Sequence, residues 1–341
     1  MTKASLSHFI RNLSLTILCL AASATVSGCG SQPAQPVSKS GYLLNTLVTV
    51  SIYETDHAIS KSSETILDDC LIKCKEYEGL FSRTIEGSDI SRINHAAPAF
   101  VTVSEDTATL LQSALDYCEW SDGLIDITIA PVKDLWGFSD LDTAKIPDET
   151  ALQSALDHVD YHCVEIDGRK VRLTDPDAAI DLGFIAKGYI ADRLKEYLMS
   201  EGVTSGIINL GGNVLTIGTK QGNAFRVGIQ RPFADTGVPI TSVACRDASV
   251  VTSGVYERYF TQGGTDYHHI LNPSTGYPAS SDLLSATILS QDSTTGDALS
   301  TTCLLLGLDK AVSLIDSLEG VDAVFITTDY EIIYSSDFKN A

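Results

Sequence analysis

The hydrophobic and polar positions of this sequence change their period along the chain, and each period predicts a different kind of element. Residues Thr46 to Tyr53 alternate apolar and polar side chains, as a half-buried strand does. Residues His57 to Leu80 repeat apolar side chains every three or four positions, which indicates a helix. Ser104 is placed to cap a second helix that runs through Trp120.

The remaining periodic segments complete the prediction. Strands are expected at 123–129, 178–182, 206–210, 214–219, 225–230, 240–245 and 284–289, helices at 147–157, 186–199, 297–306 and 309–318, and hairpins at 161–173 and 323–334. Because strands, hairpins and helices are interspersed, we expect an α+β fold of mixed, mainly antiparallel sheets with packed helices, rather than a doubly wound sheet.

The stretch 178–192 combines a buried strand end, a glycine turn and a helix start. Gly183 would free the turn sterically, and Gly188 would let another segment pack against the first helical turn. A helix start presents unpaired N–H groups and partial positive charge, and with Lys187 beside it this stretch suits a phosphate. Asp181 could accept a hydrogen bond from a hydroxyl or amino group. An ordinary strand-turn-helix corner explains the same residues equally well.

Two further stretches carry side chains suited to catalysis. The segment 267–278 holds two adjacent histidines before a turn rich in proline and glycine, and histidine can take a proton from a hydroxyl near neutral pH. A structural histidine is the alternative. Asp297 and Thr301 are four residues apart, with Ser300 close by, so their oxygens share a helix face and favour a hard cation, Mg²⁺ or Ca²⁺. Asp297 as a plain N-cap is the alternative there.

The first 40 residues are expected to be a processing segment and a tether. Lys3 and Arg11 are positively charged, and the apolar stretch Leu13 to Ala24 is too short to span a bilayer well. The sequence Val26 to Cys29 matches a lipobox, the bacterial lipoprotein signal, although a secretory signal cut near Ala24 is the alternative. We therefore expect a signal peptide at 1–28, a lipidated cysteine and flexible tether at 29–40, and one domain at 41–341.

The composition of the chain excludes some classes of binding partner. The 341 residues are 44% hydrophobic, which is ample for a full core, and carry a formal net charge of −21. That charge argues against nucleic acid and against loose adhesion to an anionic membrane surface. Six of the eight cysteines remain once Cys19 is removed with the signal and Cys29 is lipidated. They contain no CxxC and are expected to be mostly small core residues, while export allows one disulfide.

Together these stretches would give one site a phosphate cradle, a hard metal and a base, and at this point the sequence resembles the ApbE family, the FAD:protein FMN transferases. Segment 181–192 is similar to the family motif D-L-G-G-I-A-K-G-Y, 252–260 to T-S-G-x-Y-E-R-Y-F, 269–278 to H-I-x-D-P-x-T-G-x-P, and 297–301 to A-D-A-L-S-T, with further agreement at 81–94, 123–138 and 209–212. The likeness runs in order from about residue 41 to the end, and several motifs together are far more specific than one.

The resemblance implies a single T-fold-related domain that transfers FMN from FAD to a threonine hydroxyl of an exported flavoprotein. The bond formed would be a phosphoester, AMP would leave, and Mg²⁺, with Ca²⁺ as a possible substitute, would bridge the pyrophosphate. By the same resemblance His269 is the base. The metal ligands it implies are Asp297, Thr301 and the main-chain carbonyl of Phe184, with Ser300 adjacent, and the FAD-binding residues are Leu44, Thr84, Leu124, Ile125, Asp126, Asp181, Lys187 and Leu271.

This sequence departs from the family pattern at four positions. Phe184 stands where the motif usually has a small residue, and Asn272 replaces an aspartate. Thr84 and Leu44 stand where some members carry tyrosine and methionine, so flavin packing is expected to differ.

Two alternatives to transfer stay open: hydrolysis of FAD to FMN and AMP, and non-catalytic FAD binding by a lipoprotein. The chain has no convincing acceptor threonine motif of its own, so we expect the acceptor to be another protein. With a lipid anchor, the enzyme would lie on the outer face of the bacterial cytoplasmic membrane or in the periplasm.

Overall fold

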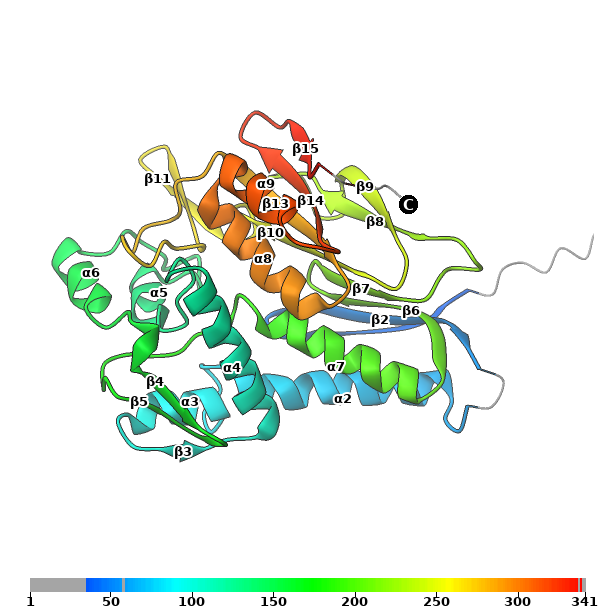
Figure 1. Cartoon of the computed structure of the whole chain (residues 1–341), viewed down its shortest axis with the longest axis horizontal. Helices are drawn as coiled ribbons and strands as arrows, with labels where there is room; N and C mark the ends of the chain where they lie inside the picture. The colour runs from blue at the N-terminus through cyan, green and yellow to red at the C-terminus, as the bar shows by residue number, and fades with distance from the viewer. Residues whose placement is uncertain (1–34, 57–58, 337, 339–341) are drawn as a thin grey trace, which may run out of the picture. The chain divides into compact units, whose positions relative to one another are not determined.

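A large antiparallel sheet organises the domain. The computed structural model describes residues 35–56, 59–336 and 338, of which 36–338 lie within one compact unit. Among the described residues, eight strands form this sheet in the order β1-β2-β6-β7-β10-β13-β14-β15 (Figure 1). They are β1 (Val37–Leu43), β2 (Thr46–Thr55), β6 (Val203–Leu210), β7 (Asn213–Ile217), β10 (Ser249–Gly254), β13 (Leu283–Ser290), β14 (Asp322–Thr327) and β15 (Ile332–Tyr334). All seven neighbouring pairs are antiparallel.

Four helices pack on one face of this sheet and a hairpin packs on the other (Figure 1). The helices are α2 (Ser63–Phe81), α7 (Ala186–Ser200), α8 (Ser293–Leu306) and α9 (Leu308–Asp316), and the hairpin is β8 (Phe225–Gln230) with β9 (Pro239–Cys245). Alternation along β14 shows why: Ala323 and Phe325 join the core beneath α8 and α9, while Val324 and Ile326 join the core beneath the hairpin. The predicted α+β class with mainly antiparallel sheets is therefore confirmed.

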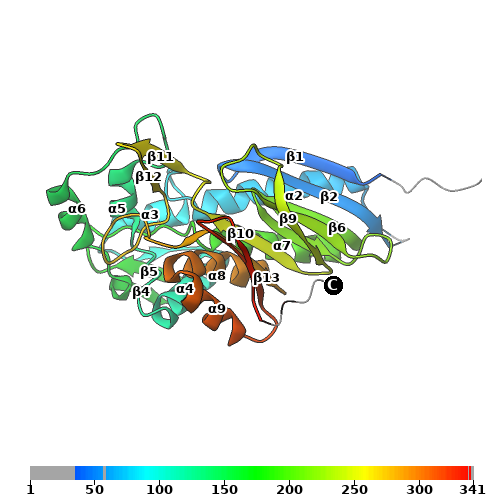
Figure 2. The same ribbon diagram turned by 90° about the horizontal axis from the view of Figure 1, so that it is seen from above.

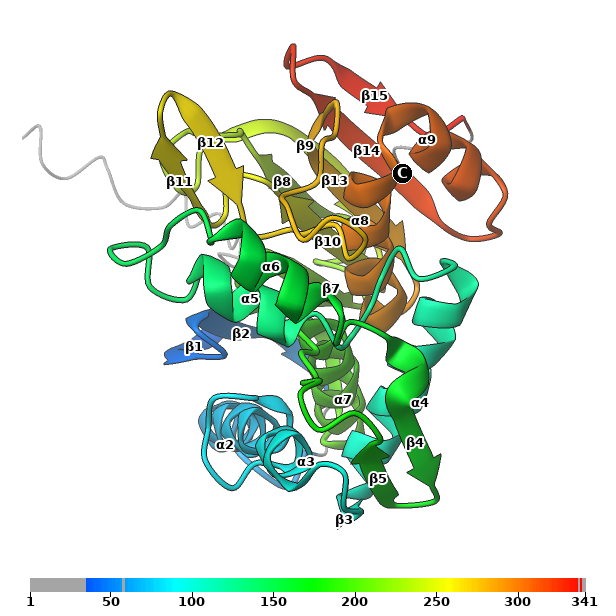
Figure 3. The same cartoon turned by 90° about the vertical axis from the view of Figure 1, so that its left-hand side faces the viewer.

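Residues 89–173 and a second hairpin build one end of the domain (Figures 2 and 3). Their elements are α3 (Asp89–Ala96), β3 (Val101–Thr102), α4 (Glu105–Trp120), α5 (Ala130–Trp136), α6 (Glu149–Leu156), a 3₁₀ turn (Tyr161–Cys163), β4 (Val164–Asp167), β5 (Lys170–Leu173), β11 (Tyr259–Gln262) and β12 (Thr265–His268). The buried ring of Trp136 contacts Phe260 and Tyr267. This aromatic cluster holds the β11–β12 hairpin against α5, next to the histidine pair.

Several element predictions are confirmed. The Ser104 hydroxyl accepts from the Thr107 N–H at 3.0 Å and caps α4 through Trp120. Strand β8 has the predicted bounds, and α7 ends one residue beyond the predicted end. The hairpin predicted at 161–173 forms, with Gly168 at φ 58° in its turn.

Two predicted strands are wrong. Residues 123–129 form turns instead, because the Asp126 carboxylate accepts from both the N–H and the hydroxyl of Thr128, at 2.7 and 2.6 Å. Residues 178–182 form no strand and meet that segment through an isolated bridge between Ile129 and Ala179 and a hydrogen bond from the Asp181 N–H to the Ile127 carbonyl at 2.7 Å. The sequence pattern also did not predict β1, β3, β10, β11 or β12.

Three boundaries need correction. The helix expected from His57 begins at Ser63, with Ser62 as its cap. Helix α8 begins at Ser293 and Asp292 caps it, so Asp297 lies in the second turn and is not an N-cap. Strand β1 begins at Val37 and pairs with β2, so the last four residues of the expected tether are a strand.

The expected signal peptide and the lipobox with Cys29 lie outside the described residues. No helix within the described ranges is both long and apolar enough to cross a membrane. The six cysteines expected in the core are all buried free thiols: Cys70, Cys74, Cys118, Cys163, Cys245 and Cys303.

Candidate active site

Two adjoining pockets bring the sequence motifs together. Both pockets are lined by Lys133, Asp181, Gly183 and His269. The first also contains Leu124, Ile125, Asp126, Phe184, Leu271 and Thr301, and the second contains Leu44, Thr84 and Lys187. Every expected catalytic and FAD-binding residue therefore lines one of these two adjoining pockets. Of the expected metal residues, Asp297 and Ser300 lie buried beside them.

A close crossing of α7 and α8 builds the metal end of this cavity. A methyl group on Gly188 would meet the Ser293 carbonyl oxygen at 2.3 Å, so the glycine lets the two backbones touch. The predicted close approach at Gly188 is thus confirmed. The contact brings Asp297 to the start of α7, where its Oδ2 accepts from the Gly188 N–H at 2.9 Å. The sequence suggested that the N–H groups at this helix start would be free to bind a phosphate. The Gly188 N–H is not free, because the Asp297 carboxylate already accepts from it.

Asp297 is a buried carboxylate whose ionised form is poorly stabilised. Its side chain lies almost entirely inside the protein. Burial raises the pKa of Asp297 to about 6, and the nearby Lys187 and the Gly188 N–H offset only part of that rise. A buried carboxylate of this kind gains stability when a cation binds to it.

Three hydroxyl groups gather where β10 meets the residues of α8 that follow Asp297. The Ser253 hydroxyl lies 2.7 Å from the Ser300 hydroxyl and 3.2 Å from the Thr301 hydroxyl. Ser300 also donates to the carbonyl of Asp297 at 2.9 Å. Phe184 and Thr301 line the same pocket, so the Asp297 carboxylate, these hydroxyls and the Phe184 carbonyl offer oxygen donors only, and hard cations such as Mg²⁺ prefer such donors. The residues present therefore fit the metal that the motifs imply.

His269 faces both pockets as a neutral imidazole. Burial, followed by the charges of Lys133 and Arg258, lowers the pKa of His269 to about 3. Its Nδ1 lies 3.2 Å from the carbonyl oxygen of Arg258, which can only accept, so Nδ1 donates. The proton on Nδ1 leaves Nε2 as the acceptor nitrogen, which is the tautomer that a general base requires.

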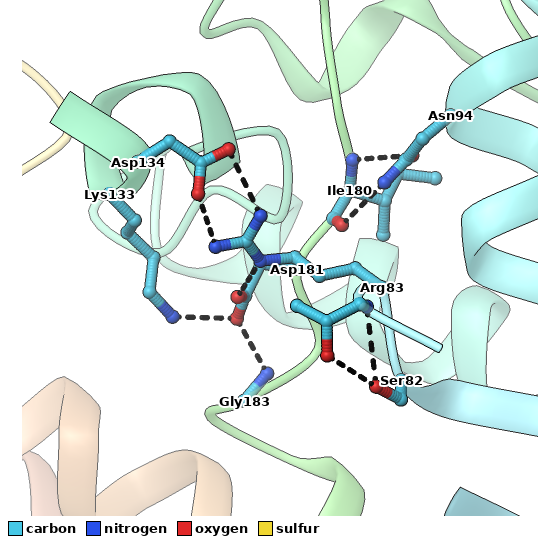
Figure 4. Close-up of polar contacts among 9 residues, drawn as sticks. Ser82, Arg83, Asn94, Lys133, Asp134, Ile180, Asp181 and Gly183 are labelled. Carbon is cyan, nitrogen blue, oxygen red and sulfur yellow. Dashed lines mark hydrogen bonds and ion pairs between the residues drawn. The ribbon is translucent and has the colours of Figure 1, made fainter. Parts of the chain in front are cut away.

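Asp181 lies at the centre of an ion-pair cluster (Figure 4). Its Oδ1 accepts from Lys133 at 2.7 Å and from the Gly183 N–H at 2.9 Å, and its Oδ2 accepts from Arg83 at 2.9 Å. Arg83 also forms a bidentate pair with Asp134, at 2.6 and 3.1 Å. Burial opposes ionisation, yet Lys133 and Arg83 together hold the pKa of Asp181 well below its usual range.

The cluster corrects two sequence interpretations. Gly183 does not have a positive φ, so its role is not conformational freedom. A methyl group there would come within 2.9 Å of the Asp181 carboxylate and 3.5 Å of the Lys133 ammonium. Asp181 itself is already bonded to protein donors on both oxygens, so it orders the pocket wall more than it offers a free acceptor.

The remaining FAD-binding candidates line the cavity in different ways. Both oxygens of Asp126 are bonded to protein donors: Oδ1 accepts from Thr128 in its own loop, and Oδ2 accepts from the Tyr161 N–H of the 3₁₀ turn at 3.0 Å. Leu44 lies in the β1–β2 turn at φ 56°, and its N–H donates to Glu78 at 2.8 Å. Phe184 packs its ring edge-to-face with Tyr117 at 6.4 Å and also lines the first pocket.

Comparison with known proteins agrees with this geometry. A model of the ApbE family matches residues 44–325. The chain belongs to the ApbE family. A protein named FAD:protein FMN transferase from Klebsiella pneumoniae is 36% identical over 88% of this chain and 92% of its own length. One of the same name from Treponema pallidum is 33% identical over 90% and 89%.

Solved ApbE structures share the fold. The ApbE protein of Thermotoga maritima superposes with a TM-score of 0.81 at 34% identity, covering 89% of this chain and 97% of that one. The flavin transferase ApbE from Vibrio cholerae gives a TM-score of 0.79 at 26% identity, covering 90% and 99%. The expected single ApbE-like domain is therefore confirmed.

Four site residues escaped the sequence interpretation: Arg83, Lys133, Ser253 and Arg258. Each lies inside a segment that matches an ApbE motif. The hydrophobic periodicity does not indicate these residues. Lys133 and Arg83, for example, both bind Asp181, which is 48 residues away from Lys133 and 98 residues away from Arg83. Proximity to a motif was the one signal that could have indicated them.

Proposed function

We propose that this protein transfers FMN from FAD to a threonine hydroxyl of another protein, releasing AMP, in a Mg²⁺-dependent reaction. The observation that supports this most directly is that Thr301, Phe184 and His269 line one pocket, while the buried Asp297 is bonded to Gly188, the residue after Lys187 of the adjoining pocket. A base and a hard-cation donor set at these pockets are more than storage of FAD requires.

The transfer needs a neutral base beside an electrophilic phosphorus. The threonine oxygen attacks the phosphorus on the FMN side of the diphosphate, and its proton passes to Nε2 of His269. The bond from that phosphorus to the bridging oxygen breaks, and the oxygen leaves with AMP. His269 is deprotonated at neutral pH and its Nδ1 proton is held by Arg258, so the base is oriented before the acceptor arrives.

The four cationic side chains of the site have two different roles in this reaction. Lys187 and Arg258 line the pocket without an ion-pair partner within 4.0 Å among the described residues, so they can contact the diphosphate. Arg83 and Lys133 are engaged by Asp181 and hold the wall that separates the two pockets. When bound by Asp297, Thr301 and the Phe184 carbonyl, with Ser300 adjacent, Mg²⁺ would offset charge that develops on the leaving phosphate.

We further propose that the enzyme works outside the cytoplasmic membrane, anchored by a lipid on Cys29. The lipobox in the printed sequence supports this. The acceptor would then be an exported flavoprotein. Labelled palmitate fed to producing cells should enter the protein, and Cys29→Ser should prevent it; equal labelling of both would refute the anchor.

The central test uses purified protein, FAD and MgCl₂ with the exported proteins of the producing cells. A denaturing gel should show a fluorescent flavin band, and mass spectrometry should place FMN on a threonine. AMP should be released in equal amount. Free FMN with AMP and no labelled band would instead indicate hydrolysis, and tight FAD binding without turnover would indicate a storage protein.

A further inference from the structure

A third cavity lies on the opposite face of the main sheet from α2 and α7. Its floor includes Thr49, Asn209 and Val214, which alternate along their strands with residues of the core beneath those helices. Its roof is formed by residues between Val227 and Pro239, in the β8–β9 hairpin and its loop. We call this cavity the sheet groove. It encloses about 710 Å³, within the range of ~300–1,000 Å³ that is common for binding sites.

Residues that line the sheet groove are next in sequence to residues that line the active-site pocket at two places. In the β1–β2 turn, Asn45 lines the active-site pocket and the next residue, Thr46, lines the groove. After β10, Glu257 lines the groove and the next residue, Arg258, lines the pocket and binds His269. The groove therefore adjoins the pocket that His269 lines, at the β1–β2 turn and after β10.

The chemistry of the groove fits an uncharged polypeptide. Although the protein carries a net charge of −21, Glu257 is the one charged side chain among the described residues that line the groove. Phe233 lies at its rim at φ 58°, with 42% of its surface exposed, and packs edge-to-face on Tyr259 at 5.2 Å. A large residue held in this backbone region and still exposed is unusual and suggests a contact yet to be made.

An extended segment also has a strand edge available. Strand β7 pairs with β10 only through Ser249, Val250 and Val251. From Thr252 onward, β10 pairs with β13 alone among the described strands, and Thr252 lines the groove. Main-chain pairing with such an edge gives affinity that does not depend on the sequence of the bound segment.

We propose that the sheet groove binds the acceptor protein, as an extended segment with uncharged side chains that presents its threonine to His269. This inference rests on the proposed transfer reaction, because it names the surface that the second substrate uses. Aromatic contacts with Phe233 and apolar contacts with Leu47 would supply much of the binding energy.

The first test measures the KM for the acceptor. The probe is a synthetic peptide of the acceptor that the gel experiment identifies, spanning the labelled threonine. Phe233→Ala and Leu47→Arg should each raise its KM by about tenfold or more, with the FAD Kd and the kcat close to wild type. Ile72→Arg is the matched control, since Ile72 is 56% exposed on α2 and Leu47 is 62% exposed in the groove. An unchanged KM in both groove variants would overturn the proposal.

A crosslinking test is independent of turnover. Benzoylphenylalanine at position 233 should crosslink the peptide under light, whereas the same group at Phe100, which is 45% exposed, should not. Equal crosslinking at both positions would reject the groove. If the wild type labels no protein at all, the transfer reaction has failed and the groove proposal falls with it; if it labels the acceptor but the variants behave normally, only the groove proposal fails.

Discussion

The two buried carboxylates of the active site are placed in opposite electrostatic surroundings. Asp181 and Asp297 each accept from a main-chain N–H of the same segment, at Gly183 and Gly188, both at 2.9 Å. Asp181 is paired with Arg83 and Lys133, and its pKa falls. Burial raises the pKa of Asp297 to about 6, and no cation lies within 4.0 Å of it among the described residues.

This difference distinguishes a structural carboxylate from one that awaits a ligand. The protein supplies the counter-charges of Asp181 itself, so that carboxylate stabilises the fold. Asp297 lacks such a counter-charge and costs stability until a cation arrives. A buried acid without a partner is therefore the better indicator of function than a buried acid within a salt-bridge cluster.

The largest expected effect follows from removing the charge of Asp297. Asp297→Asn keeps the shape but loses the anionic ligand, so Mg²⁺-dependent transfer should fall by roughly 10³-fold, about 4 kcal/mol of barrier. The measurement is covalent labelling as a function of MgCl₂. Asp309→Asn, in the first turn of the neighbouring helix α9, is the control and should remain active. Full activity of Asp297→Asn would remove the metal assignment.

Replacing the base should give the next largest effect. His269→Ala should lower the kcat by about 10²–10⁴-fold while FAD still binds with the wild-type Kd. His268→Gln is the control, because that neighbouring histidine contacts the carbonyl of Ala279 instead of the pocket. A normal rate in His269→Ala would show that another group accepts the proton.

The comparison also predicts opposite stability changes for two identical substitutions. Asp181→Asn leaves Arg83 and Lys133 without their shared anion and should lower the free energy of unfolding by roughly 1–3 kcal/mol. In EDTA at pH 7.5, Asp297→Asn should instead raise the free energy of unfolding. Urea unfolding of both variants provides the measurement. If both variants lose stability equally, the contrast between the two carboxylates is wrong.

The smallest effect is the pH dependence of that stability gain. The folded pKa of Asp297 is raised to about 6, so ionisation costs stability above that pH. Below about pH 4 the carboxyl is protonated in both folded and unfolded states, and the cost disappears. The advantage of Asp297→Asn over the wild type should therefore be present at pH 7.5 and shrink towards pH 4. An advantage that is constant with pH would point to packing instead.

Sequence patterns predicted the parts of the fold that local chemistry determines. Ser104 caps its helix as expected because the bond it makes is three residues away. The segment 123–129 failed because Asp126 bonds locally to Thr128 and overrides its apolar run. Strand β10 was missed because its partners β7 and β13 are distant in sequence.

The active site shows the same division. His269, Asp297 and Thr301 were predicted from the sequence, because their residue types suit a base and a metal site and they lie in the family motifs. The residue types of Lys133 and Arg83 do not indicate a role in the site, since a lysine or arginine is usually a solvated surface residue. Only the folded chain reveals that both reach one aspartate.

The main-chain contact between α7 and α8 bears on which substitutions the turn at position 184 can accept. The separation of the Phe184 turn from Asp297 is determined where the main chain at Gly188 meets that at Ser293, with no side chain between them. The ring of Phe184, which packs on Tyr117, takes no part in that main-chain contact. A chain built in this way can exchange the residue at position 184 during evolution while the spacing between these two segments stays constant.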